Sequence, residues 1–417
     1  MATSVSRRTL LIAGAGTAAG LSLPGAAADA SASTRVGFRL DAEVLDGGEQ
    51  ITSITVFTAR LGRIDAASLT TGTFRVHATA TSPITLAPGD QVGYDLDRAV
   101  TAVRLDHRGN IVLELSHAEG QAGGNTLGYV VSRSRNVVLD LVYTITQTAP
   151  IALRDGGSLT ISSFVQGRLS DPEVDAFSYH RSDSGMKYRL FTPGRDARGR
   201  RPLVVWLHGG GEGASLPDDY YDNETTLRAN RGALGFATPQ AQRIFSGAYV
   251  VAPQSTSFWL EDGPRFAPLI LEIVSDLVRR HRIDRDRIYV TGASNGGYMS
   301  LKMTTTYPRL FAASVSICPV VAPRTPGGPP MITDAELRSI ETPTWLVASR
   351  DDTTVPPEPN AVHAHDLIPG SLLTLYDHVV WNGHQFPGHW SWIYVARNDP
   401  SVGRTHIWQW MAHRRRP

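Results

Sequence analysis

The chain is poor in cysteine, in lysine and in net charge, and each shortage excludes a class of protein. Its one cysteine, Cys318, cannot form an internal disulfide. Only Lys187 and Lys302 are lysines, which we attribute to genome composition. The net charge of +1 argues against a nucleic-acid or polyanion partner, which would require a clustered basic surface. With 41% hydrophobic and 19% charged residues over 417 positions, the sequence is typical of a globular protein with room for two domains.

The sequence also lacks an apolar run long enough to span a membrane, and its N-terminus comes closest. A twin arginine at residues 7–8 precedes a stretch rich in Ala, Gly and Leu. This stretch is shorter than the ~20 residues of a transmembrane helix, which argues against a membrane anchor. Small residues follow it, so cleavage is expected after Ala28, with Ala30 or Ala32 as alternatives. The pattern predicts a twin-arginine-type signal peptide over residues 1–28 and a secreted or extracytoplasmic protein.

Residues 33–150 have the composition of β-strands separated by turns rich in Gly, Asn and Asp. The candidate strands are residues 36–45, 51–58, 73–78, 102–105, 111–115 and 137–146. Short strands at this spacing, without a convincing helix, predict a β-sandwich of immunoglobulin-like type. The region has no cluster of catalytic residue types, so we interpret it as a docking or structural module. Residues 151–180 are predicted to be a connection.

Residues 181–417 instead alternate between predicted strands and predicted helices. The strands are residues 188–191, 203–207, 248–252, 287–291, 313–318, 344–348 and 372–376, and the clearest helices are residues 266–281 and 405–413. This alternation predicts a mostly parallel sheet with helices on both faces. The order of the motifs described below is that of an α/β-hydrolase, so the sequence predicts a two-domain protein.

The stretch Gly292-Ala293-Ser294-Asn295-Gly296 joins a predicted strand to a predicted helix and has the spacing of a nucleophile elbow, G-x-S-x-G. A serine on so sharp a turn has a strained backbone, and flanking glycines remove side chains that would collide with the adjacent strand and helix. The turn would expose the Ser294 hydroxyl, while the new helix directs free N–H groups to the same point. Ser294 is therefore the predicted nucleophile.

A second glycine-rich stretch, His208-Gly209-Gly210-Gly211-Glu212, follows the predicted strand 203–207. This is the position of an HGGG-type oxyanion loop, in which glycine lets the backbone approach a substrate carbonyl. We assign the oxyanion donors to the N–H of Asn295 and to that of Gly210 or Gly211. A flexible loop without a catalytic role is the alternative.

An acid and a base are expected beyond later strands. Asp351 and Asp352 both follow the strand 344–348, and we prefer Asp352 because it begins the D-x-x-V-P spacing usual in esterases and oligopeptidases. His384 and His389 both follow a glycine near the C-terminus. We prefer His389, which opens the sequence His-Trp-Ser-Trp, and keep His384 as the alternative. An aspartate at this point would orient the histidine and stabilise its charged form.

Other polar candidates have a weaker case. His363 and His365 lie two residues apart in a predicted helix, whereas helical metal ligands are usually three or four apart. Cys318 ends an apolar strand and is expected in the core rather than as a nucleophile. We therefore expect no metal site and no cofactor.

The oxyanion loop, the elbow, Asp352-Thr-Thr-Val-Pro356 and Gly388-His-Trp-Ser-Trp392 together resemble secreted esterases with an immunoglobulin-like N-terminal domain. These are a branch of the prolyl oligopeptidase and polyhydroxybutyrate-depolymerase-like serine hydrolases. The resemblance implies that Ser294, Asp352 and His389 form the catalytic triad. One departure is Gly213, because many of these relatives have arginine there, so a charge at the mouth of the site is expected to be missing. For Glu212 the simplest expectation is a structural ion pair.

The sequence thus predicts an exported serine hydrolase that cleaves carboxylic esters through an acyl-enzyme. One alternative is a serine peptidase of the prolyl oligopeptidase type, although the β-rich region is too short for a propeller. The other is an inactive extracellular binding protein on a hydrolase scaffold. The expected partner is a small-molecule or polymer-linked ester, with no nucleic acid and no membrane after signal cleavage. Trp390 and Trp392 would suit an aromatic or sugar-linked ester, but they fit the core equally well.

Overall fold

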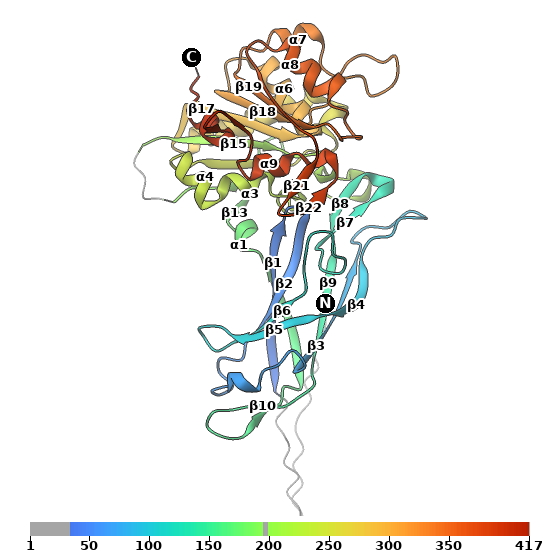
Figure 1. Cartoon of the computed structure of the whole chain (residues 1–417), viewed down its shortest axis with the longest axis vertical. Coiled ribbons are helices and arrows are strands. Elements are labelled where there is room, and N and C mark those ends of the chain that lie inside the picture. The colour runs from blue at the N-terminus through green and yellow to red at the C-terminus, as the bar shows by residue number, and fades with distance from the viewer. Residues whose placement is uncertain (1–33, 195–198, 417) are drawn as a thin grey trace, which may run out of the picture.

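The computed structural model describes residues 34–194 and 199–416. The predicted signal peptide, residues 1–28, lies outside the described residues. Figure 1 shows an elongated molecule, with a strand-rich N-terminal region at one end and an α/β region at the other. None of the helices in the described ranges combines the length and the apolar character that a membrane crossing requires.

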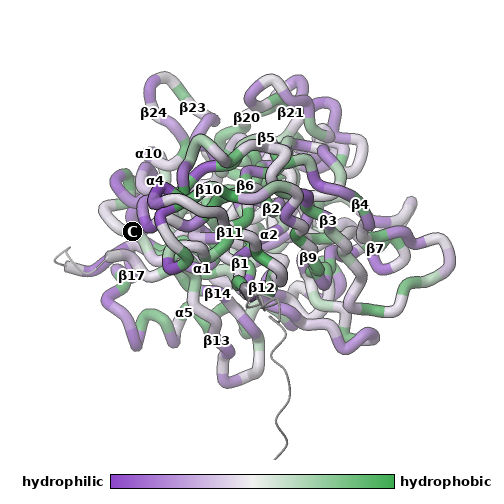
Figure 2. Tube along the Cα trace, turned by 90° about the horizontal axis from the view of Figure 1, so that it is seen from below, coloured by the Kyte–Doolittle hydropathy of each residue, from purple (hydrophilic) through white to green (hydrophobic). Residues whose placement is uncertain are grey.

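Two sheets build the N-terminal region. One has the order β12-β1-β2-β6-β5 and the other the order β4-β3-β9. Their bounds are β1 Arg35–Leu45, β2 Gly48–Val56, β3 Phe74–Thr81, β4 Tyr94–Arg98, β5 Val100–Leu105, β6 Ile111–Leu115, β9 Asp140–Gln147 and β12 Ser163–Ser170. Phe38 and Leu40 of β1 share one core with Phe74 and Val76 of β3, so alternate residues of both sheets face inward. In Figure 2 hydrophobic stretches follow the inner strands and hydrophilic stretches follow the outer loops.

The N-terminal region differs from the predicted organisation in two places. The predicted strand 137–146 is two strands, β8 (Arg135–Val138) and β9, and β8 pairs only with β7 (Leu127–Val130) to form a separate hairpin. The predicted connection 151–180 contains β12, which pairs in parallel with β1 at the edge of the five-stranded sheet. The β7–β8 hairpin reaches the α/β region in Figure 1.

The α/β region contains an eight-stranded sheet with the order β13-β14-β16-β15-β17-β18-β19-β20. Its strands are β13 Phe177–Arg181, β14 Lys187–Phe191, β15 Arg201–Leu207, β16 Tyr249–Pro253, β17 Ile283–Ala293, β18 Ala313–Ile317, β19 Thr344–Ser349 and β20 Leu372–Tyr376. Neighbours from β16 to β20 are parallel, whereas β13 and β14 pair antiparallel. The predicted mostly parallel sheet is confirmed.

Helices cover both faces of this sheet. The helices are α1 Pro172–Asp175, α2 Thr225–Arg228, α3 Gly232–Ala237, α4 Pro239–Ile244, α5 Gly263–Arg280, α6 Asn295–Thr306, α7 Asp334–Arg338, α8 His363–Leu367, α9 Trp392–Ala396 and α10 Ile407–Ala412. Successive residues of β15 enter different cores: Val205 packs with α5 and α6, whereas Trp206 packs with α3 and α10. This two-sided burial explains why β15 is an unbroken apolar run.

Candidate active site

Ser294 lies on the sharp turn between β17 and α6. Its backbone has φ 56° and ψ −113°, a conformation that residues with a side chain rarely adopt. The Ser294 N–H donates to the carbonyl oxygen of Ile317 at 2.8 Å, which fixes the turn to β18. A β-carbon at Gly292 or Gly296 would collide with the carbonyl oxygen of Leu207. The glycines of the motif are thus required by the close approach of β15.

The glycine-rich loop follows β15 as a single 3-10 turn, Gly210–Glu212. His208 precedes this turn and is buried. Its Nε2 accepts a hydrogen bond from the Ser255 N–H, and its Nδ1 lies 2.6 Å from the Gly209 carbonyl oxygen. Burial lowers the pKa of His208 to about 3, so the imidazole is neutral and supports the loop. Gly210 lines a cavity with Ser294 and Asn295, whereas Gly211 lines a neighbouring one.

Asp352 and His389 are joined across the C-terminal loops. His389 Nδ1 lies 2.8 Å from Asp352 Oδ2, and the Asp352 side chain is fully buried. The other carboxylate oxygen accepts the N–H groups of Thr354 and Val355 at 2.9 and 2.8 Å. The D-x-x-V-P spacing therefore places two backbone donors around the carboxylate, which holds it in position for the imidazole.

The two alternatives from the sequence make other contacts. Asp351 Oδ2 lies 2.9 Å from His378 Nδ1, so this carboxylate faces a different histidine. His384 packs edge-to-face on Phe386 with 4.6 Å between ring centroids, and it lies against Gly120 of the N-terminal region. The structure thus pairs Asp352 with His389 and leaves Asp351 and His384 in separate environments.

Ser294 and His389 meet at one cavity of about 330 Å³, which Gly210 and Asn295 also line. As the first residue of α6, Asn295 has a backbone N–H without an intrahelical acceptor. The nucleophile, the histidine and candidate oxyanion donors from two separate loops therefore surround the same space. This arrangement has the components that acyl transfer requires.

Cys318 is a further neighbour of the histidine. It lies at the end of β18, is buried as expected, and its Sγ is 3.4 Å from the His389 carbonyl oxygen. Burial lowers the pKa of His389, but Cys318 and the hydrogen-bonded Asp352 outweigh burial and hold this pKa above its ordinary value. The Asp352 carboxylate can stabilise the charge that the imidazole gains when it accepts a proton.

The described residues contain one cluster with the ligand types of a metal site. Cys318, Asp352 and His389 have ligand atoms within 4.8 Å of one another, but the hydrogen bond between the last two already occupies a pair of these atoms. His363 and His365 do not converge, because His363 bonds to Asp334 and His365 to Ser371.

Arg135 is a functional candidate that the sequence did not indicate. From β8 of the N-terminal region it donates to the carbonyl oxygens of Ala214 at 3.2 Å and Gly210 at 3.3 Å, and its guanidinium lies over the Phe258 ring. A positive charge is therefore present beside the oxyanion loop, although Gly213 lacks the arginine of the resembled family. Only a pairing between regions distant in sequence creates this contact, so no local signal could have revealed it.

Glu212 also differs from the expectation of a structural ion pair. It is 8% exposed, and within the described part of the chain its Oε2 has no hydrogen-bond partner. Burial raises the pKa of Glu212 to about 7, although a hydrogen bond from the Gly209 backbone N–H and the charges of Arg135 and His389 act to lower this pKa. Glu212 is thus a buried carboxyl group at the site whose Oε2 lacks a hydrogen-bond partner among the described residues.

Comparisons with known proteins agree with this geometry. The model of the prolyl oligopeptidase family matches residues 266–328, which include the elbow. The chain is 37% identical over 129 residues to poly(3-hydroxyalkanoate) depolymerase C of Paucimonas lemoignei, covering 28% of this chain and 27% of that protein. It is 34% identical over 112 residues to acetylxylan esterase A of Emericella nidulans, covering 22% of this chain and 37% of that protein. These matches therefore span less than two fifths of each relative's own length.

One solved structure is similar over nearly the whole chain. The crystal structure of a thermostable esterase superposes with a TM-score of 0.72 at 25% identity, covering 91% of this chain and 99% of that one. The similarity therefore extends beyond the α/β region to the strand-rich region. It supports an esterase-type α/β-hydrolase fold for the described chain.

Proposed function

Because this chain is an α/β-hydrolase with esterase relatives, we propose that it hydrolyses carboxylic esters through Ser294, His389 and Asp352. The observation that carries the proposal is the shared cavity, in which a strained serine and an aspartate-bound histidine lie beside the glycine-rich loop. The proposed substrates are small-molecule or polymer-linked esters, since the relatives include a polyhydroxyalkanoate depolymerase and an acetylxylan esterase.

In this mechanism the Ser294 hydroxyl oxygen attacks the acyl carbonyl while His389 Nε2 takes its proton. The carbonyl oxygen becomes an oxyanion, for which the N–H groups of Asn295 and Gly210 are the proposed donors. The imidazolium then gives its proton to the departing alcohol oxygen, and the acyl group remains on Ser294. Water hydrolyses this acyl-enzyme by the same proton transfers in reverse, and Asp352 keeps the imidazole oriented throughout.

The test is the Ser294→Ala variant. We expect it to fold, to lose at least about a thousandfold in kcat on p-nitrophenyl acetate, and to escape labelling by a fluorophosphonate probe. Ser371→Ala is a matched control, because Ser371 is also 8% exposed but bonds to His365. Full activity and labelling of Ser294→Ala would exclude this serine as the nucleophile, and a wild type that is never labelled would indicate an inactive binding protein.

Peptide hydrolysis is the second candidate, because the matching family model is that of prolyl oligopeptidases. p-Nitrophenyl acetate and p-nitroacetanilide carry the same acyl group on an ester and an amide. An esterase is expected to hydrolyse only the first at a useful rate. Comparable kcat/KM values on both would favour a peptidase.

We further propose that residues 1–28 direct twin-arginine export and that the N-terminal sandwich is immunoglobulin-like. The support is the sequence pattern of the first 28 residues and the two sheets that share one core. Replacing Arg7 and Arg8 by lysine should leave the enzyme inside the cell. Unchanged extracellular activity of that variant would contradict the export route.

A further inference from the structure

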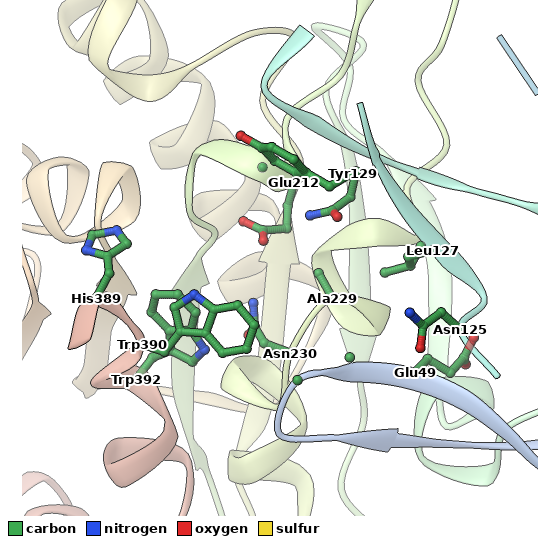
Figure 3. A pocket seen from close by; sticks show the side chains of 14 residues that line it. Glu49, Asn125, Leu127, Tyr129, Glu212, Ala229, Asn230, His389, Trp390 and Trp392 are labelled. Atoms are coloured by element: carbon green, nitrogen blue, oxygen red, sulfur yellow. The ribbon is translucent and has the colours of Figure 1, made fainter. Parts of the chain in front are cut away.

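A second cavity, of about 460 Å³, lies between the N-terminal region and the α/β region. His389, Trp390 and Trp392 line it from the C-terminal loops, and Tyr129 and Asn136 line it from the β7–β8 hairpin. Figure 3 shows the two tryptophans on one side and Leu127 and Asn125 on the other. Its volume is within the range of small-molecule sites, and neither region could form it alone.

A comparison with a third cavity shows on which side of the catalytic groups the interdomain cavity lies. The third cavity, of about 490 Å³, contains Ser294 but not His389, and Leu260, Val320 and Val355 give it apolar walls. The interdomain cavity contains His389 but not Ser294. In serine ester hydrolysis the histidine gives its proton to the departing alcohol. The interdomain cavity is thus on the alcohol side, and the apolar cavity suits the acyl group.

The walls of the interdomain cavity combine flat apolar surfaces with hydrogen-bonding groups. The rings of Trp390 and Trp392 are stacked, with 5.6 Å between centroids and 29° between planes, and both are half-buried. A broad aromatic surface of this kind can pack against the face of a ring-shaped ligand. Asn136 and Asn230 add amide groups that can both donate and accept hydrogen bonds.

Some buried polar atoms of the lining residues lack a partner. Within residues 34–194 and 199–416, Glu212 Oε2, Glu49 Oε1 and Trp392 Nε1 have no hydrogen-bond partner. Glu49 already binds Arg228 through its other oxygen, so Glu212 and Trp392 are the groups left for a ligand. Glu212 is 8% exposed, so water does not replace its missing bond freely. A carboxyl group and an indole donor on one cavity favour a ligand with hydroxyl groups over a hydrocarbon.

We propose that this cavity binds the alcohol part of the substrate and that this alcohol is a carbohydrate ring, esterified at one hydroxyl. The ring would stack on the tryptophan pair, and its free hydroxyls would bond to Glu212 and Asn136. The inference rests on the proposed ester hydrolysis. It also gives the N-terminal region a role in substrate selection, since Tyr129 and Asn136 belong to that region.

The experiment uses acyl transfer, because an alcohol that attacks the acyl-enzyme occupies the place of the departing alcohol. The bond between the acetyl carbon and Ser294 Oγ breaks, a bond to the sugar oxygen forms, and His389 moves the alcohol proton to Oγ. The full chain is given p-nitrophenyl acetate with equal concentrations of methyl β-D-xylopyranoside or ethanol. We expect the ratio of acetylated product to free acetate to be at least about tenfold higher with the glycoside.

Variants assign that preference to the cavity. Trp390→Leu and Asn136→Ala should each lower the transfer ratio for the glycoside about tenfold relative to that for ethanol. Trp381→Leu is the matched control, because Trp381 belongs to the same aromatic cluster but does not line the cavity. This control should keep the wild-type ratio.

The outcomes separate the two proposals. If the wild type releases no p-nitrophenol, the proposed ester hydrolysis is wrong. If it turns over but transfers acetate equally to both alcohols, only the carbohydrate subsite is wrong. The subsite is also wrong if Trp381→Leu lowers the ratio as much as Trp390→Leu. A change in acyl-chain preference in Trp390→Leu without a change in the ratio would place the acyl group here instead.

Discussion

Burial of the Glu212 carboxyl group makes the stability of the folded protein depend on pH. Burial raises its pKa from the ordinary 4.5 to about 7, while a hydrogen bond from the Gly209 backbone N–H and the charges of Arg135 and His389 lower this pKa by smaller amounts. A folded-state pKa above the unfolded one means that the folded state binds the proton more tightly. The resulting stability is fully present below about pH 4.5 and is lost as pH rises through 7.

We predict that Glu212→Gln removes part of this pH dependence. The amide keeps the shape of the side chain but has no charge to bury, so the variant should be more stable than wild type above pH 8. The gain should be about 2–3 kcal/mol at pH 8.5 and near zero at pH 4.5. Urea unfolding at both pH values measures it.

A surface residue provides the control for this prediction. Glu43→Gln, at an exposed position of β1, should leave the free energy of unfolding unchanged at both pH values. Some pH dependence will persist in Glu212→Gln, because burial also raises the pKa of Glu49 to about 7. If Glu212→Gln is no more stable than wild type at pH 8.5, the carboxyl group is paired in solution.

At the scale of elements, the sequence predicted those parts of the site that depend on local spacing. The glycines around Ser294 and the backbone amides around Asp352 lie within a few residues of these side chains, so short motifs reveal them. The contact that requires the glycines is distant in sequence, because a β-carbon at either one would collide with Leu207. The β7–β8 hairpin could not be predicted in this way. A pattern of alternating residues identifies a strand but not the sheet that it joins, and residues 137–146 gave no sign of the break before β9.

That hairpin leads to a prediction about the oxyanion loop. Arg135 binds the loop through two carbonyl oxygens and stacks on Phe258, so its planar fork holds Gly210 in place. Arg135→Lys keeps the charge but loses the fork and the stacking. We expect kcat on p-nitrophenyl acetate to fall at least about tenfold with a smaller change in KM, because oxyanion stabilisation acts on the transition state.

Arg133→Lys is the control for this element. Arg133 lies two residues away, and its side chain is 41% exposed in an ion pair with Asp218. Its replacement should change kcat less than twofold, because exposed ion pairs contribute little. Equal kcat values for Arg135→Lys and wild type would mean that the loop is rigid without the N-terminal region.

At the scale of the whole molecule, the cavity between the regions requires that they keep a fixed relative position. Ion pairs across the boundary provide this constraint. Arg397 binds Asp46 through two hydrogen bonds of 2.9 and 3.0 Å, and Arg228 binds the buried Glu49 at 2.9 Å. Bidentate pairs fix orientation as well as distance, so they suit a boundary that forms part of a binding site.

Arg397→Leu tests this coupling, because it leaves the 5% exposed carboxylate of Asp46 without its partner. We expect the free energy of unfolding to fall by about 2 kcal/mol, which is below the full cost for a buried pair because Arg397 is 31% exposed.

All 8 tryptophans lie in the α/β region, so fluorescence follows that region alone, whereas circular dichroism follows both. If the ion pairs join the regions into one cooperative unit, both signals should shift together in urea. Arg104→Leu, in an exposed pair within one sheet, should shift neither, and a shift confined to dichroism would show that the regions unfold independently.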